Sequence, residues 1–138
     1  MVDASVLVKW FIHEPGTDAA LRVRDDFVAG DIDLHAPSHA PFEVLNALRY
    51  SPFCTEERCQ QAQVALDRYG VAYHPLAGEM GRRAVHLAYT KDLSIYDAAY
   101  LALARELVGR VVTADSALAA AGGSDAVLLA EYVPHEDG

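Results

Sequence analysis

The chain begins with an almost unbroken apolar run over residues 1–12, whose apolar members include Val6, Leu7, Val8, Trp10, Phe11 and Ile12. Such a run is typical of a strand buried on both faces of a parallel sheet, so we predict a first strand there. Asp3 interrupts the run near its start. An ionised carboxylate in a core strand costs free energy unless it is paired or bound to a metal ion. Asp3 is therefore the first candidate for a functional residue.

Beyond this run, long segments with apolar residues at helical spacing are separated by short apolar segments. The helical spacing predicts helices over residues 17–30, 38–50, 55–70, 78–92, 94–108 and 115–121. The short segments predict strands over residues 31–36, 71–76, 110–113 and 126–129. Strands that alternate with helices indicate a parallel sheet with helices on both faces. We therefore expect an α/β fold, a three-layer α/β/α sandwich with a central, mostly parallel sheet, as a single domain over residues 1–138.

The starts and inner faces of these helices follow from particular residue types. Hydroxyl side chains that could cap helix starts stand at Thr17, Ser38, Thr55 and Ser94. Spacing predicts that the helix over 38–50 buries Phe42, Leu45 and Leu48. The same reasoning predicts that the helix over 78–92 buries Met80, Ala84, Leu87 and Ala88.

Composition excludes several classes of protein. The 138 residues are 52% hydrophobic, which is enough for a real core, and no apolar run approaches the roughly 18 residues of a membrane span. The N-terminus lacks the basic segment and cleavage site of a signal peptide, so we expect a cytoplasmic location. Cys54 and Cys59 are too few for a disulfide framework, and no further zinc ligands accompany them.

The formal net charge is −9. Proteins that hold duplex DNA by wide phosphate neutralisation depend on Lys and Arg, so this charge argues against that class. It leaves open a nuclease with a small basic rim beside its site. It also suits a basic protein partner.

Three further acids stand where sites form in parallel sheets, beyond the carboxyl ends of the strands. Asp115 directly follows a predicted strand, Asp97 begins a predicted helix, and Glu43 lies in the first turns of another. Each acid also has a structural explanation. Asp97 fits a capping box with Ser94, Asp115 could be an N-cap, Glu43 could be an exposed helix residue, and Asp3 could lie in a frayed terminus. Taken one by one, the acids leave both readings open.

Four segments spread along the chain carry a resemblance to a known family: Val2–Val8, Pro41–Arg49, Leu93–Ala104 and Val112–Asp115. They resemble the PIN-domain ribonucleases, and among them the VapC toxins of prokaryotic toxin–antitoxin pairs. The resemblance implies that four acids bind Mg²⁺ or Mn²⁺ and carry the cleavage of RNA, namely Asp3, Glu43, Asp97 and Asp115. It implies supporting roles for Ser5 and Thr113, and it places Asp3 at the mouth of the cluster. Carboxylates and water are natural ligands of both ions.

The same resemblance implies partners: an RNA substrate, a cognate antitoxin protein and a second copy of the chain in a homodimer. Phe53 and Tyr69, on the middle helices, are candidate dimer-interface residues. Basic residues near the motifs are candidates for contacts with substrate phosphates, namely Lys9 and Arg49, and with them Arg82, Arg83 and Arg105. Aromatic residues that could stack bases are Trp10, Phe11 and Tyr96, although we expect them to pack in the core. We expect His39 to be structural or exposed.

Two other functions deserve comparison with the metal-dependent endoribonuclease. The first is a catalytically silent PIN-like binding or scaffold module. The second is an aspartyl-phosphate enzyme of the haloacid dehalogenase type, which also places an Asp on an apolar strand. Those enzymes carry a second Asp two residues later, where this chain has Ser5. The sequence therefore disfavours the second alternative.

Overall fold

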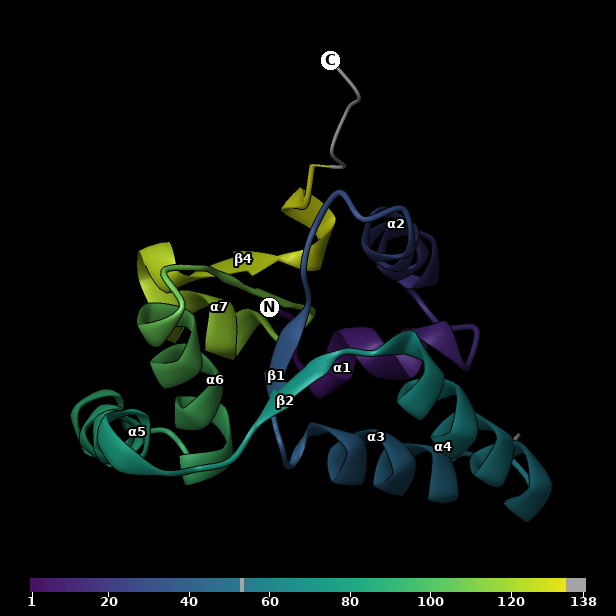
Figure 1. Cartoon of the computed structure of the whole chain (residues 1–138), viewed down its shortest axis with the longest axis horizontal. Coiled ribbons are helices and arrows are strands. Elements are labelled where there is room, and N and C mark those ends of the chain that lie inside the picture. Colours follow the sequence, from purple (N-terminus) through teal and green to yellow (C-terminus); the bar gives the residue numbers. More distant parts are fainter. Residues whose placement is uncertain (53, 134–138) are drawn as a thin grey trace.

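The computed structural model describes residues 1–52 and 54–133 (Figure 1). Its strands form two parallel pairs. β1 (His35–Pro37) pairs with β2 (Ala72–His74), and β3 (Val111–Thr113) pairs with β4 (Ala126–Leu128). Helices lie on both sides of these strands, as Figure 1 shows. The architecture is the predicted three-layer α/β/α sandwich with parallel strands.

The first residues of the chain lie between the two strand pairs. Val2 forms a parallel bridge with Val112. The Val112 N–H donates to the Met1 carbonyl oxygen at 2.8 Å, and the Asp3 N–H donates to the Val112 carbonyl oxygen at 3.3 Å. On the other side, the Val2 N–H donates to the His35 carbonyl oxygen at 3.4 Å. The extended backbone ends with Asp3, and α1 begins at the next residue, so Asp3 stands at the edge of the sheet.

The predicted strand over residues 1–12 is wrong beyond this point. The chain turns into α1 (Ala4–Leu7) and then into a 3-10 helix, η1 (Val8–Trp10). The Asp3 side chain accepts the Val6 N–H and so caps α1. Val6, Leu7, Val8 and Trp10 are buried as expected, whereas Phe11 and Ile12 are half-buried. Burial alone cannot distinguish a strand from a short buried helix, because both give a continuous apolar run.

The remaining helices overlap their predicted ranges: α2 (Thr17–Val28), α3 (Ala40–Arg49), α4 (Glu56–Tyr69), α5 (Gly78–Lys91), α6 (Ile95–Glu106) and α7 (Ser116–Gly122), with single 3-10 turns at η2 (Gly123–Asp125) and η3 (Leu129–Glu131). Thr55 and Ser94 cap α4 and α6 as predicted. Thr17 and Ser38 are not caps, and their places are taken by Gly16 and His39. Among the described residues, no helix is both long and apolar enough to cross a membrane.

The hydrophobic core is centred on α6, in which every residue from Ala98 to Ala104 is buried. α5 packs against α6 through the four residues predicted to face inward. The prediction for α3 was partly wrong, because its buried residues are Ala40, Val44 and Leu48, whereas Phe42 is 77% exposed. α3 thus presents a large aromatic ring to solvent near its first turn.

Candidate active site

Asp3 is a buried carboxylate with a full set of donors. Only 6% of the residue is exposed. The Ser5 hydroxyl donates to its Oδ1 at 2.5 Å, and the Thr113 hydroxyl donates to its Oδ2 at 2.5 Å. The Val6 N–H adds a third bond to Oδ1 at 3.3 Å. Both hydroxyl residues expected to support the site therefore contact this acid.

The pKa of Asp3 is raised, chiefly because burial disfavours the charged form. The hydrogen bonds from Ser5, Thr113 and Val6 oppose this shift, and the negative charge of Glu43 adds to it. Ionisation of the Asp3 carboxyl therefore remains unfavourable despite three donors, and a nearby cation would stabilise its charged form.

The same hydroxyls connect Asp3 to the turn that carries Asp115. The Asp115 N–H donates to the Thr113 hydroxyl oxygen at 3.0 Å, and the Ala114 N–H donates to the Ser5 hydroxyl oxygen at 2.9 Å. Asp115 caps α7, because its Oδ1 accepts the N–H groups of Ala117 and Leu118. Its side chain is exposed. Two acids that are more than a hundred residues apart thus share one hydrogen-bond network.

Glu43 lies at the first turn of α3 and is held from α6. The Tyr100 hydroxyl, on a residue that is 1% exposed, donates to Glu43 Oε1 at 3.0 Å. His39 Nε2 lies 3.2 Å from the same oxygen, although the contact lacks hydrogen-bond geometry. Burial, followed by the charge of Glu43 and the bond to it, raises the pKa of Tyr100, so the phenol remains a donor.

Tyr100 is a residue that sequence reasoning missed. It stands one helical turn after Asp97 in an otherwise Ala- and Leu-rich buried stretch. A phenol in such a stretch usually finds a partner for its hydroxyl, and that rule could have identified it.

Asp97 lies near the start of α6 and is half-buried. The Ser94 hydroxyl accepts the Asp97 N–H at 3.0 Å, so Ser94 performs the capping. Burial is the main cause that raises the pKa of the Asp97 carboxyl, and the charges of Asp115 and Glu43 raise it further. The four acids are therefore electrostatically coupled, since Asp97 senses Asp115 and Glu43, and Asp3 senses Glu43.

We call Asp3, Glu43, Asp97 and Asp115 the acidic patch. Its possible metal ligands are carboxylate oxygens that repel one another, and these suit a hard divalent ion. Within residues 1–52 and 54–133, no three His, Cys, Asp or Glu side chains approach closely enough to hold a metal ion as they stand. Mg²⁺ keeps several of its waters and uses one or two carboxylates directly. A loose set of four acids is consistent with that mode of binding.

Three of the five basic residues predicted to contact substrate form ion pairs, whereas Arg49 and Arg83 are exposed. Lys9 was proposed for this role, but its ammonium lies 2.8 Å from Glu14 Oε1 and its side chain is 10% exposed. Arg49 is exposed, but it lies at the opposite end of α3 from Glu43, with its guanidinium 5.3 Å from the ring centroid of Tyr50. Arg82 and Arg105 pair with Glu79 and Asp125. Three of the five predicted basic side chains are therefore engaged by acids other than Asp3, Glu43, Asp97 and Asp115.

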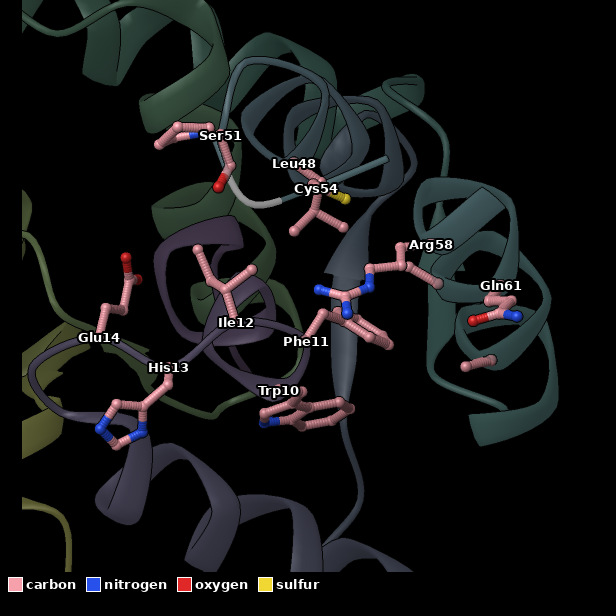
Figure 2. Close-up of a pocket in the computed structure, with 13 residues that line it drawn as sticks. Trp10, Phe11, Ile12, His13, Glu14, Leu48, Ser51, Cys54, Arg58 and Gln61 are labelled. Atoms are coloured by element: carbon pink, nitrogen blue, oxygen red, sulfur yellow. The ribbon is translucent and has the colours of Figure 1, made fainter. Parts of the chain in front are cut away.

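A separate hollow of about 820 Å³ lies between the N-terminal segment and α4 (Figure 2). Trp10, Phe11 and Arg58 line it, and none of the four acids does. Trp10 itself is 8% exposed and donates from Nε1 to the Ala20 carbonyl oxygen, so its predicted core role is confirmed. The hollow and the acidic patch are distinct features of the surface.

Comparison with known proteins adds the family. A comparison with curated proteins finds no significant match. The family described as PIN domain matches residues 1–124, which is most of the chain. PIN domains are generally nucleases that need divalent metal ions. On this match, the chain belongs to the PIN-domain family.

Proposed function

We propose that this protein is an endoribonuclease dependent on Mg²⁺ or Mn²⁺ and that it acts as the toxin of a toxin–antitoxin pair. The observation that carries the proposal is the gathering of four acids from four separate segments in a family of nucleases: the Thr113 hydroxyl joins Asp3 to the Asp115 backbone, and the charge of Glu43 raises the pKa of both Asp3 and Asp97. Carboxylates gathered in this way repel one another and make folding less favourable. Such clusters are typical of functional sites.

The four acids would hold the metal ion, and they are prepared for it in different ways. Ser5 and Thr113 fix the orientation of Asp3, and Tyr100 fixes that of Glu43. Asp97 and Asp115 begin helices and are less enclosed, so they face incoming substrate. A divalent ion, when bound, supplies charge neutralisation at the phosphate and lowers the pKa of a water molecule.

The proposed partners are RNA, a cognate antitoxin and a second copy of the chain, in the cytoplasm. The net charge of −9 supports a basic antitoxin segment, and the partly apolar hollow in Figure 2, which none of the four acids lines, offers it a separate surface. For the homodimer, Tyr69 is half-buried against Trp10, with ring centroids 4.9 Å apart. Phe53, the other predicted interface residue, lies outside the described residues.

The test is cleavage of a panel of structured RNAs with Mn²⁺, with and without a chelator. Asp97→Asn should reduce the rate by more than about a hundredfold, since even outer partners of metal ligands cost 10–100-fold. Asp92→Asn is the matched control, because Asp92 is exposed and its left-handed backbone (φ 52°) also suits Asn. Full activity of Asp97→Asn, or none in the unaltered protein across the panel, would contradict the proposal.

A second candidate is a PIN-like module that binds partners but does not cut. It is favoured by the spacing of the acids, since no three described metal-ligand side chains stand close enough to hold an ion. Calorimetric titration with Mn²⁺ at neutral pH separates the two candidates. Binding that Asp97→Asn abolishes supports the nuclease, whereas no binding supports the silent module.

A further inference from the structure

Two large aromatic side chains stand exposed beside the acidic patch, against the sequence prediction that both are inward. Phe42 is 77% exposed and Tyr96 is 62% exposed. Each directly precedes one of the four acids, Phe42 before Glu43 and Tyr96 before Asp97. Tyr96 lies against the His39 ring, whose Nε2 is 3.2 Å from Glu43 Oε1, and Phe42 shares the first turn of α3 with Glu43, so the two rings stand near the patch on two different helices, α3 and α6.

The Tyr96 ring does not stand alone. It meets the His39 ring edge-on, with centroids 5.3 Å apart and planes at 71°. His39 in turn meets the buried Tyr100 ring edge-on, also at 5.3 Å. His39, the N-cap of α3, and Phe42 are three residues apart, and residues at that spacing lie on the same side of a helix. The exposed Tyr96 ring is thus continuous with a packed aromatic group formed by His39 and Tyr100.

The negative charge of the protein disfavours binding of RNA through its phosphates, and the exposed rings offer another source of affinity. Ion pairs engage Lys9, Arg24, Arg82 and Arg105 with neighbouring acids. These are four of the eleven Lys and Arg side chains, and with a net charge of −9 the protein as a whole repels RNA phosphates. Stacking of bases on aromatic rings is the alternative source of affinity, and it needs no positive charge.

We propose that Phe42 and Tyr96 form a base-stacking site for unpaired nucleotides of the RNA next to the phosphate that is cut. This inference rests on the proposed ribonuclease function and names how its substrate is held. Duplex RNA covers its base faces with neighbouring pairs, so the site selects unpaired segments such as loops. Phe42 and Tyr96 are binding residues, and the acids remain responsible for chemistry.

Fluorescence anisotropy with a labelled single-stranded oligoribonucleotide tests the proposal. The parent protein is Asp97→Asn with Mg²⁺, so that cleavage does not deplete the probe. Phe42→Ala and Tyr96→Ala should each weaken binding by about tenfold, in line with stacking energies per base. Phe42→Tyr and Tyr96→Phe should retain affinity, because they keep the ring. Tyr50→Ala is the matched control, since Tyr50 is 75% exposed at the far end of α3.

Two further measurements make the outcome decisive. Stacking predicts a loss of less than about tenfold between 50 and 200 mM salt, where a phosphate-driven complex loses about 10³–10⁵. The same sequence as a duplex should bind at least tenfold more weakly. Alanine variants that bind like the parent, a parent that binds no single strand, or equal binding of the duplex would each overturn the stacking site. Cleavage by the unaltered protein with unchanged binding in the alanine variants would reject the stacking site alone and leave the proposed function standing.

Discussion

The N-terminal segment (residues 1–10) and α6 begin in similar ways but use their aspartates differently. Both are apolar runs with an aspartate near the start, and both become helices with a polar cap. In the N-terminal segment, Asp3 is itself the cap and accepts the Val6 N–H. In α6, Ser94 is the cap, so the carboxylate of Asp97 is not needed for it.

This difference separates an anchored acid from a responsive one. Asp3 is 6% exposed and held by two hydroxyls, so its orientation is set by the fold. Asp97 is half-buried, and its pKa depends also on the charges of Asp115 and Glu43. We therefore expect changes around Asp3 to affect folding and changes at Asp97 to affect mainly metal and activity.

Metal binding should give the largest effect. At a free Mn²⁺ concentration one hundred times its dissociation constant, the free energy of unfolding should rise by about 2.7 kcal/mol. Asp97→Asn should lose most of this gain, whereas Asp92→Asn should keep it. Thermal unfolding with increasing Mn²⁺ measures both. An equal gain in both variants would show that Asp97 takes no part in holding the ion.

Thr113→Val should give the next largest effect, on the anchored side of the comparison. The change is nearly isosteric, but it removes the donor to Asp3 Oδ2 and the acceptor of the Asp115 N–H. We expect a loss of about 1–3 kcal/mol in the free energy of unfolding, because buried polar groups lose their partners. Urea unfolding measures it. Thr90→Val, at an exposed position of α5, is the control. An equal loss of stability in that variant would show that the hydrogen bonds to Asp3 are not the cause.

Ser94→Ala removes the N-cap of α6, the second of the two regions compared. It should cost about 1 kcal/mol, the usual value for losing an N-cap hydroxyl. Asp97 should keep its place in the helix, so Mn²⁺ binding should change little. If Ser94→Ala abolished metal binding in calorimetry, Asp97 would depend on its cap as strongly as Asp3 depends on its hydroxyls.

The smallest effect concerns pH without metal. The pKa values of Asp3 and Asp97 are raised above the ordinary value of 3.8, so the folded state binds these protons more tightly than the unfolded state. Their favourable contribution is present below that value and is lost as pH rises through the folded pKa values. Asp97→Asn should therefore match the unaltered protein in stability near pH 3.5 and exceed it at pH 7. Urea titrations in a chelating buffer check this, and a deficit at pH 7 would contradict the coupling of the acids.

Much of the local structure was accessible from the sequence because it depends on near neighbours. The hydroxyls of Thr55 and Ser94 cap their helices, and α5 buries the face that helical spacing predicts. The prediction of a strand over residues 1–12 was wrong because Asp3 is the N-cap of a helix, α1, and not a residue inside a strand. The inward prediction for Phe42 was wrong because burial depends on which neighbouring elements cover a helix face, and a helical period does not specify them.

By itself, then, the sequence determined the helices from α2 to α7, the α/β class and the four acids as candidates, since these follow from periodicity, capping and residue type. Only the tertiary structure decided that Ser5 and Thr113 hold Asp3, that Tyr100 holds Glu43, and that Phe42 and Tyr96 face solvent beside them. The reason is physical. Contacts such as the one between Thr113 and Asp3 join residues more than one hundred positions apart, and no local pattern records which side chains the sheet brings together.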